Sequence, residues 1–488
     1  MSAETKDMKI ATYEQFGAVG DGATDDMPAI VACHEYANAN MLPVKARDGA
    51  KYYIGGKNIT AMIKTDTDFG DAEFIIDDRK LESVYTECFR VQPDGESYTA
   101  TIPNLERGQK KVDFPHDGRV YVRVKSSERK IFIREGLNQN NGTDQTDCFV
   151  VDADGNILTD IDWDYAKISE ARVKPANDRP ITIRGGKFTT IANQWKSEYR
   201  YHSRGFTISR SNVTIEGVTH YVTGELDHGA PYAGFISISE AVDVTVRDCL
   251  LTPHFTYQTE SKIPTKKVSM GSYDLSVNAS IGVKLIGIRQ TIDIMDSRYW
   301  GLMGSNFCKD MYLEGCVMSR FDAHQGVTNA TIRGCTLGHM CLNLIGHGNF
   351  LIEDSQTFGN SLISLRPDYG STFDGIVTIR NCAWKPRSQN MTVLYASNSG
   401  NHDFGYVCHM PRRVYIDGLK ILDGDIGDES TRLYVLPDYD RSFSSGKPHA
   451  YVPTEYVRIR NVTTESGRKC ELCAKPEEYP YIVFVDEG

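Results

Sequence analysis

The sequence predicts an all-β protein built as a parallel β-helix, with an N-terminal capping helix and a β-rich insertion. Three observations support this fold class: a glycine-rich loop that runs into a helical pattern near the N-terminus, a strand phrase that recurs from residue 180 onward, and a different β-rich stretch between them. At 488 residues the chain exceeds the usual size of one compact core. Stacked architectures escape that limit because each repeat contacts only its neighbours.

The capping helix is predicted from residues 16–33. Three glycines in the loop allow positive φ and close chain approach. Thr24 or Asp25 can cap the helix that follows, and Pro28 suits its first turn. A short amphipathic helix here can cover the open end of a sheet stack, whose unpaired edge otherwise invites aggregation. We therefore expect the N-terminal cap and the first coils in residues 1–97.

The main β-helix is predicted from a repeated phrase of alternating β-branched or aliphatic residues, followed by Gly, Asp or Asn and a small residue. The phrase starts at Ile181, Val213, Val244, Tyr312, Thr331, Leu351, Thr378, Val414 and Val457. A sandwich of short strands is the alternative, but it does not predict one phrase returning at so narrow a spacing. We assign residues 179–465 to the β-helix and 466–488 to a C-terminal cap or tail.

Several of the twelve cysteines recur at one position of the phrase. This register places Cys249, Cys316, Cys335 and Cys382 in one interior column. Such a column favours reduced thiols packed as small hydrophobic side chains. A lone CxxC at residues 470–473 lacks a second pair or neighbouring histidines, so we do not expect zinc there.

Residues 98–178 differ from the repeat and are predicted to form a β-rich insertion. Apolar runs at 119–124, 130–134 and 148–151 suggest strands. The pair Asp154-Gly155 lies between apolar runs and is a hairpin signal. We expect this insertion to lean on the stack and to form one wall of a binding cleft.

The loop at 16–26 with its helix, and the strand at 52–56, resemble the opening of the pectate lyase superfamily. These right-handed parallel β-helices include polysaccharide lyases, polygalacturonase-like glycosidases, uronan epimerases and phage tailspikes. The resemblance implies a right-handed coil and a carbohydrate ligand, and it does not select a reaction. Gly346-His347-Gly348 is similar to a polygalacturonase motif, but the paired aspartates before it and the basic tripeptide after it are missing.

Charge and hydropathy limit the partners. The net charge of -11 and the pI near 5.6 argue against nucleic acid. No run of about 18 apolar residues predicts a membrane span, and residues 1–15 lack the pattern of a signal peptide. We therefore expect either a cytoplasmic protein or a mature form whose export signal was removed. The carbohydrate substrate is the expected partner, and the chain is a monomer or a homotrimer, since no heptad tail decides between them.

A candidate site follows from aligning the coils on Gly304, Gly326, Gly346 and Gly370. In this alignment one column holds Trp300, Asp322, Leu342 and Arg366. The column two residues later holds Leu302, His324, Leu344 and Asp368. Side chains alternate between the faces of a strand, and the intervening residues, such as Phe321 and Ala323, suit the interior. The polar residues are therefore predicted to point outward together, in an amphipathic groove suited to sugars.

The grouped side chains predict β-elimination on a uronate, which needs a base, a cationic clamp for the carboxylate and an acid. His324 suits the base and Arg366 the clamp, with Tyr369 or His347 as the acid. Asp322 is expected to orient the imidazole or the guanidinium, and Asp368 is a further catalytic candidate. Further substrate-binding candidates are Trp300, Arg320, His339, Asp227 and His228. We expect no cofactor, and no acidic cluster indicates Ca²⁺.

Two alternatives remain open at this point. A glycoside hydrolase needs two carboxyl groups about 5 Å or roughly 6.5–9.5 Å apart. Strand spacing places Asp322 and Asp368 ~12 Å apart, which disfavours this pair but leaves Glu225, Asp227, Asp293, Asp296 and Asp374 as other partners. The second alternative is a noncatalytic glycan-binding or tailspike-like adhesin, which the cluster of titratable groups disfavours.

Overall fold

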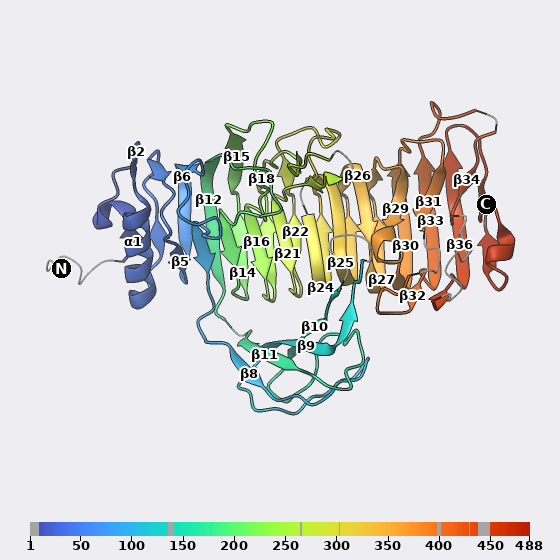
Figure 1. Cartoon of the computed structure of the whole chain (residues 1–488), viewed down its shortest axis with the longest axis horizontal. Helices are drawn as coiled ribbons and strands as arrows, with labels where there is room; N and C mark the ends of the chain where they lie inside the picture. The colour runs from blue at the N-terminus through green and yellow to red at the C-terminus, as the bar shows by residue number, and fades with distance from the viewer. Residues whose placement is uncertain are drawn as a thin grey trace. The chain divides into compact units, whose positions relative to one another are not determined.

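The computed structural model describes residues 9–134, 141–176, 178–263, 266–301, 303–397, 402–428, 430–437 and 449–488. Its contacts divide the chain into two units. The first unit comprises Met1–Glu96, Pro175–Val277 and Lys284–Met303, and the second comprises Ser97–Lys174, Asn278–Val283 and Gly304–Gly488. Figure 1 labels helix α1 and many of the strands.

The first unit opens with the predicted cap. It contains β1 (Ala11–Thr12), the 3-10 helix η2 (Tyr13–Phe16), β2 (Asp21–Asp25) and α1 (Met27–Asn40). Helix α1 begins after Asp26, whose carboxylate accepts hydrogen bonds from the amides of Val19 and Gly20 at 2.7 and 3.1 Å. Asp25 accepts a bond from the Met27 amide at 3.2 Å. The acidic residues of the opening motif therefore fix the loop and the start of the helix.

The rest of the first unit is a set of parallel strands. They are β3 (Val44–Lys45), β4 (Lys51–Ile54), β5 (Ala61–Ile63), β6 (Thr67–Asp77), β7 (Phe89–Val91), β12 (Ile181–Ile191), β13 (Phe206–Ile208), β14 (Val213–Glu216), β15 (Thr219–Thr223), β16 (Ile236–Ser239), β17 (Val244–Arg247), β18 (Leu250–Leu251), β21 (Leu275–Asn278), β22 (Lys284–Ile286) and β23 (Arg289–Gln290). Strand β12 pairs in parallel with β6, β14 and β15, so each coil stacks on the next. A short antiparallel pair, β19 (Tyr257–Gln258) and β20 (Ser269–Met270), branches from one turn. Aromatic rings line the interior, with Phe74 stacked on Phe188 at 4.7 Å and Phe89 on Phe206 at 4.8 Å.

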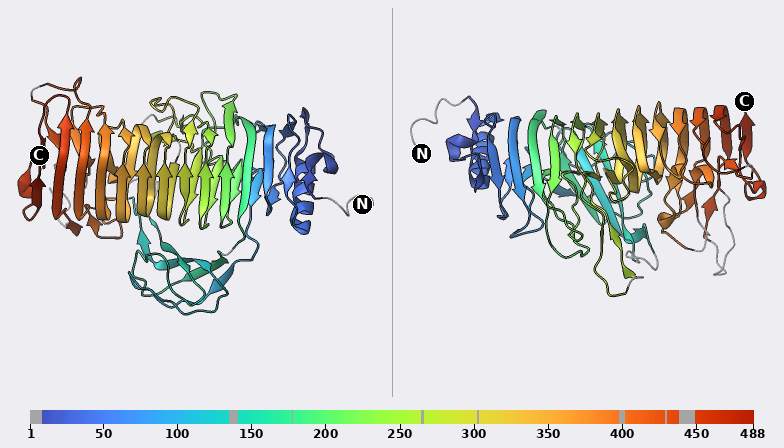
Figure 2. Two further views of the ribbon diagram at one scale, coloured as in Figure 1. Left: turned by 180° about the vertical axis from the view of Figure 1, so that it is seen from behind. Right: turned by 90° about the horizontal axis from the view of Figure 1, so that it is seen from above.

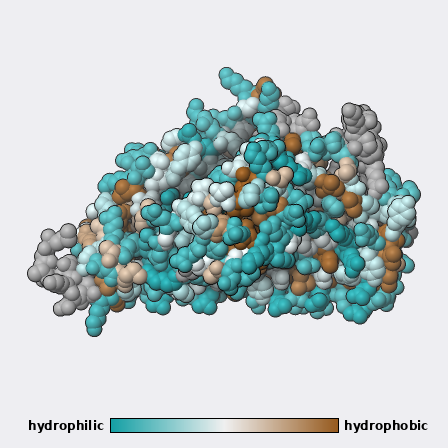
Figure 3. All heavy atoms as spheres, turned by 90° about the horizontal axis from the view of Figure 1, so that it is seen from below, coloured by the Kyte–Doolittle hydropathy of each residue, from teal (hydrophilic) through white to brown (hydrophobic). Residues whose placement is uncertain are grey.

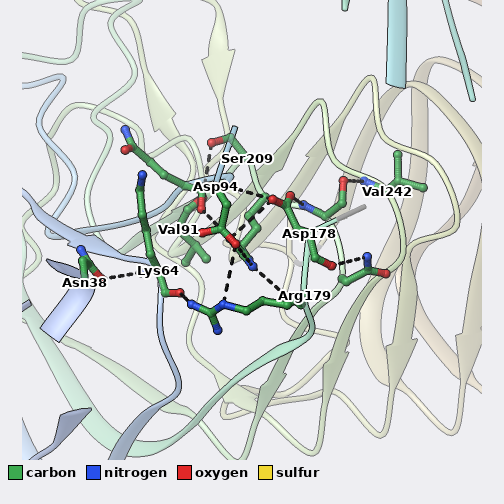
Figure 4. A network of polar contacts seen from close by, with 12 residues as sticks. Asn38, Lys64, Val91, Asp94, Asp178, Arg179, Ser209 and Val242 are labelled. Carbon is green, nitrogen blue, oxygen red and sulfur yellow. Dashed lines mark hydrogen bonds and ion pairs between the residues drawn. The ribbon is translucent and has the colours of Figure 1, made fainter. Parts of the chain in front are cut away.

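A polar network in the first unit lies beside the points where the chain leaves this unit at Glu96 and returns at Pro175 (Figure 4). The amide of Asp94 donates to Asp178 at 2.9 Å, and the fully buried guanidinium of Arg210 pairs with both carboxylates at 2.9 and 3.5 Å. Arg179 donates to the carbonyl of Lys64. The network therefore joins the chain just before residue 97 to the chain just after residue 174.

The insertion belongs to the second unit and forms a four-stranded antiparallel sheet. Its strands are β8 (Tyr98–Ala100), β9 (Val120–Ile131), β10 (Thr143–Val151) and β11 (Glu170–Pro175), in the order β10-β9-β11-β8. Its own core of aliphatic and aromatic residues includes Val122, Phe149 and Val173. The pair Asp154-Gly155 makes the expected tight turn, in which the Gly155 amide donates to the Asp152 carbonyl at 3.1 Å.

The remainder of the second unit is again a parallel stack (Figure 2). Its long strands are β24 (Met303–Glu314), β25 (Val317–Arg333), β26 (Thr336–Leu344), β27 (Gly346–Glu353), β30 (Phe373–Trp384), β33 (Arg413–Ile421) and β36 (Tyr456–Thr464). Its shorter elements are β28 (Gln356–Thr357), β29 (Ser361–Leu365), η4 (Pro367–Tyr369), β31 (Met391–Tyr395), β32 (Cys408–His409), β34 (Leu433–Tyr434), β35 (Tyr451–Val452), β37 (Cys470–Glu471), η5 (Pro476–Glu478) and β38 (Val483–Asp486). One face of the stack, formed by parallel pairing of β25, β26, β29 and β31, carries the candidate site described below.

All nine repeated phrases lie in strands, and the structure explains their composition. The Gly, Asp or Asn of each phrase has a positive φ, as at Gly334 (59°), Asp354 (50°) and Asn381 (50°). Gly reaches this left-handed region freely, and Asp and Asn reach it more easily than other residues. In the second unit Cys316, Cys335, Ser355 and Cys382 follow one another in a buried column. All twelve cysteines are buried and reduced, as the sequence predicts.

The predicted fold class is confirmed: the protein is an all-β, right-handed parallel β-helix. Among the described residues, no helix is both long enough and apolar enough to span a bilayer. On the face drawn in Figure 3, hydrophobic residues form small patches separated by hydrophilic ones.

Candidate functional site

A set of charged and aromatic side chains, here called the guanidinium cluster, gathers in the second unit. It consists of Arg134, Arg320, Asp322, His324, Arg366, Asp368 and Tyr369. Arg366 is its centre, because one side of its guanidinium donates to Asp322 at 2.7 Å and the other side donates twice to Asp368, at 2.9 and 3.1 Å. Arg320 pairs with Asp322 at 3.1 Å, and Arg134 pairs with Asp368 at 3.1 Å.

Local structure places these side chains together. Asp322 and His324 lie on the same face of β25, since only Ala323 stands between them. Pro367 follows β29 and starts the 3-10 turn η4, which carries Asp368 and Tyr369. Gly370 closes this turn with a φ of 82°, and a Cβ there would lie 2.5 Å from the Cys408 Sγ atom.

The cluster carries an excess of positive charge. Burial alone would raise the pKa of Asp322, but Arg320 and Arg366 outweigh it and hold this pKa below its ordinary value. Burial would also raise the pKa of Asp368, but Arg366 and Arg134 hold it below its ordinary value. Both carboxylates are therefore ionised at neutral pH. Three guanidiniums face two carboxylates, which leaves a charge of +1 when His324 is neutral.

His324 has the protonation state of a general base. Burial and the nearby Arg366 charge lower its pKa to about 4, so the imidazole is neutral at neutral pH. Its Nδ1 atom lies 3.0 Å from Oδ1 of Asn306, which can only accept, so Nδ1 carries the proton. The lone pair is then on Nε2, which lies 3.4 Å from the Tyr369 hydroxyl. At that distance the hydroxyl bonds Nε2 only weakly.

Tyr369 is fully buried, so it is placed to orient His324 and not to touch a ligand. Its ring packs edge-on against His324 and Phe132, with centroids 5.4 Å away in both cases. The guanidinium carbons of Arg134 and Arg366 lie 5.1 and 5.7 Å from its centroid. Burial raises the pKa of Tyr369, so the phenol keeps its proton.

Asp322 differs from its predicted position. The sequence placed it on an outer, accessible strip, but it is only 1% exposed because Arg320 and Arg366 cover it. The predicted separation of ~12 Å from Asp368 is also wrong. A guanidinium is small, and acids bound to its two sides have oxygens within about 8 Å of each other.

The predicted coil register is wrong as well. Asp322 pairs with Asn343 and not with Leu342, and Gly346 pairs with Val327 and not with Gly326. The reason is an irregularity in the pairing of β25 with β26. Met318 pairs with Leu337 and Arg320 pairs with Cys341, so β26 has two more residues than β25 between these pairs. The outward ladder on this face is Asp322, Asn343, Ser364 and Tyr395.

This ladder leads from the guanidinium cluster into an open pocket of about 460 Å³, here called the amide-hydroxyl pocket. Its polar lining consists of His339, Asn343, Asn360, Ser361, Ser364, Ser388, Asn390 and Tyr395. Amides and hydroxyls beside an exposed aromatic ring suit sugar hydroxyls and a pyranose face. Asn343 borders both regions, because it pairs with Asp322 and lines the pocket.

His347 lies apart from the guanidinium cluster, in a narrow cavity of about 30 Å³ lined by Asp162, Trp163, Asp374 and His409. Its ring packs edge-on against Trp163 at 4.8 Å, and burial lowers its pKa. The sequence predicts His347 close to the other catalytic candidates, but the structure places it in this separate cavity.

The other predicted residues divide between the units. Arg320 is in the cluster and His339 lines the amide-hydroxyl pocket. Trp300 belongs to the first unit, where it packs over Gly271 and near Tyr273. Asp227 and His228 also belong to the first unit, on an exposed loop in which they bond each other at 2.9 Å.

Sequence reasoning missed Arg134, Asn306, Asn343, Ser364 and Tyr395. Arg134 comes from the insertion, more than 200 residues from Arg366 in sequence, so no local pattern marks it. Asn343 could have been found, since it stands within the aligned strand, but the wrong register hid its pairing with Asp322.

The fold and this site define the class of protein: a parallel β-helix that presents a polar, cationic strip and a pocket on one face. No protein-family model matches the sequence, and no curated protein matches it.

Solved structures with a similar fold include three phage tailspikes. The Pseudomonas phage phi297 tailspike gp61 has a TM-score of 0.56 and 12% identity, covering 98% of this chain and 84% of its own. The tailspike gp49 of Pseudomonas phage LKA1 has a TM-score of 0.50 and 14% identity, covering 93% of this chain and 81% of its own. The third structure is the Gp54 tailspike of Acinetobacter baumannii bacteriophage AP22, in complex with A. baumannii capsular saccharide. It has a TM-score of 0.50 and 10% identity, covering 95% of this chain and 77% of its own. These likenesses establish the shared fold.

Proposed function

We propose that the protein is a carbohydrate-active enzyme that cleaves an acidic, uronate-containing polysaccharide or oligosaccharide by β-elimination. The observation that carries the proposal is the neutral imidazole of His324 held among three guanidiniums that outnumber their carboxylates. A base and a cationic group that binds the carboxylate are two of the features that this reaction requires.

The ligand class follows from charge and lining. The surplus positive charge of the cluster favours a carboxylate, and the amide-hydroxyl pocket next to it offers hydrogen bonds to sugar hydroxyls. The similar tailspike of phage AP22 is in complex with a capsular saccharide, and this supports a glycan as the ligand here.

In the proposed reaction, Nε2 of His324 removes the proton on the carbon next to the uronate carboxylate. The electron pair of that C–H bond moves into the carboxylate, and Arg134 and Arg366 stabilise the developing charge. The electrons then return to form a C=C bond while the C–O bond to the leaving sugar breaks. The leaving oxygen takes its proton from water, since Tyr369 is buried and His347 lies in a separate cavity with a lowered pKa. The imidazolium passes its proton to solvent.

Hydrolysis is the second candidate, because Asp322 and Asp368 are closer together than strand spacing suggests. A hydrolase needs one protonated carboxyl group to act as the acid. The guanidiniums lower the pKa of both groups, so this pair lacks an acid at neutral pH. Elimination uses the same residues without that requirement.

The test is incubation with a panel of uronic acid glycans, followed by both ultraviolet absorbance and new reducing ends. We expect absorbance and reducing ends to rise together, because elimination leaves an unsaturated product. Reducing ends without absorbance would identify a hydrolase. Binding with neither signal would identify an adhesin. Arg134→Met is expected to reduce the absorbance rate at least tenfold, with His449→Gln, an exposed histidine in another part of the second unit, as the matched control.

A further inference from the structure

The first unit carries an open pocket of about 470 Å³ that the proposed cleavage does not use. It is lined by Arg79, Gln194, Trp195, Lys196, Glu198, Arg200 and Ala230. Trp195 is 38% exposed, and the polar side chains from 194 to 200 around it are exposed too, except Ser197. The volume is within the range of sites that bind small molecules or sugar units.

Hydrogen bonds join the two loops that line this pocket. Asn193 is buried and joins two loops, because its side chain both donates to the Ala230 carbonyl and accepts from the Ala230 amide at 2.9 Å. The Trp195 amide donates to the same Asn193 oxygen at 3.2 Å. The indole packs edge-on against the buried ring of His202, with centroids 5.8 Å apart. The fold therefore holds an exposed aromatic face in a fixed position without covering it.

The charges around the indole favour an anion. Asp77 holds Arg79 through two hydrogen bonds, at 2.6 and 2.9 Å, so these two charges offset each other. Lys196 and Arg200 then stand against one acid, Glu198. This surplus occurs in a chain whose net charge is -11, so it is a local reversal of the overall sign. An aromatic face beside lysine and arginine matches a pyranose ring that carries a carboxylate or a sulfate.

We propose that this pocket is a second, noncatalytic binding site for one anionic sugar unit of a polysaccharide, which stacks on Trp195 and pairs with Lys196 and Arg200. The site holds the polymer to the first unit. It is independent of the cleavage chemistry, because the pocket belongs to the first unit and shares no residue with the guanidinium cluster.

The test is affinity electrophoresis of the full chain in gels that contain polygalacturonate, alginate or dextran sulfate, with neutral dextran for comparison. A His324→Gln background prevents cleavage during the run. We expect at least one anionic polymer to retard the protein, and Trp195→Ala and the double variant Lys196→Gln/Arg200→Gln each to weaken the apparent affinity about tenfold. Added salt should weaken the binding as well. Tyr481→Ala, which removes a 91% exposed aromatic ring elsewhere, is the matched control and should change nothing.

Unchanged retardation in the Trp195 and double variants would overturn the proposal, as would equal retardation by neutral dextran or no retardation by any anionic polymer. Failure of the cleavage proposal has a different signature. If the His324→Gln protein still releases unsaturated product, His324 is not the base, while the effect of Trp195→Ala on retardation stands on its own.

Discussion

At the scale of single residues, Asp368 is the most informative side chain of the candidate site. Its carboxylate accepts two hydrogen bonds from Arg366 and pairs with Arg134. A uronate carboxylate would bind these guanidiniums with the same geometry. It therefore positions the two guanidiniums and also competes with an anionic ligand for them. The sequence predicts Arg366 as the carboxylate clamp, and in the structure both sides of its guanidinium are already bonded to acids.

We expect Asp368→Asn to strengthen binding of an acidic glycan, because the charge of the cluster rises from +1 to +2. Michaelis kinetics should show KM falling two- to tenfold on acidic substrates at low salt, with the difference shrinking as salt is added. A KM that rises on acidic substrates would contradict this role. Asp417→Asn removes a partly exposed, ion-paired acid elsewhere in the second unit and serves as the control.

The residues of the site show where sequence reasoning stops. Asp322, His324, Arg366 and Asp368 could be grouped because they recur at similar places in successive coils. The exact pairings could not, because an irregularity between β25 and β26 shifts the register without a sequence signal. Arg134 and Asn306 could not be identified either, since only the folded chain brings them to His324 and Asp368.

At the scale of elements, a buried ion pair holds the insertion to the β-helix within the second unit. Lys309 of β24 is 1% exposed and pairs with Asp147 of β10 at 2.7 Å and with Asp162 at 3.3 Å. Burial raises the pKa of Asp147, and the Lys309 charge offsets part of this rise. Because Arg134 follows β9 of the same sheet, this pair also helps to position the cluster.

Replacing Lys309 with Met should lower the free energy of unfolding by about 3–5 kcal/mol, because it leaves buried acids without their cation. Urea denaturation at pH 7 measures the change. The double variant Lys309→Met/Asp147→Leu should recover part of the loss, since it removes a buried charge and adds apolar contact. A single variant as stable as the parent chain would show that the pair does not secure the insertion.

At the scale of the whole molecule, the fold could be predicted because its rule is local and repeated. Alternating apolar residues followed by Gly, Asp or Asn mark a strand and a corner with positive φ, and the nine phrases of the chain obey it. The cap could be predicted for a similar reason, since its acids bond the loop amides close to them in sequence. The sequence predicted that the insertion is β-rich, turns at Asp154-Gly155 and leans on the stack. It could not predict which residues make the contact, because the packing depends on contacts distant in sequence.

Buried histidines make the stability of the molecule depend on pH. Burial lowers the pKa of His34 to about 3 and of His202 to about 4, against about 6.5 in an unfolded chain. Between pH 6.5 and 4 the unfolded chain thus binds more protons than the folded one, so the free energy of unfolding falls as pH is lowered. His202→Phe should reduce the loss between pH 7 and pH 5 by about 1–2 kcal/mol, because it removes one such group. Urea denaturation at the two pH values measures this, and an equal loss in both proteins would contradict it.

The most direct measurement is the initial rate of ultraviolet-absorbing product from one acidic glycan that the protein cleaves, for the parent chain and for His324→Gln, across pH 3 to 9. If His324 is the base, the parent chain loses activity with an apparent pKa near 4 as the imidazole is protonated. His324→Gln then retains less than about 1% of the rate at pH 7 while keeping its affinity for the glycan. Full turnover by His324→Gln, with the same acidic limb, would contradict the proposed mechanism.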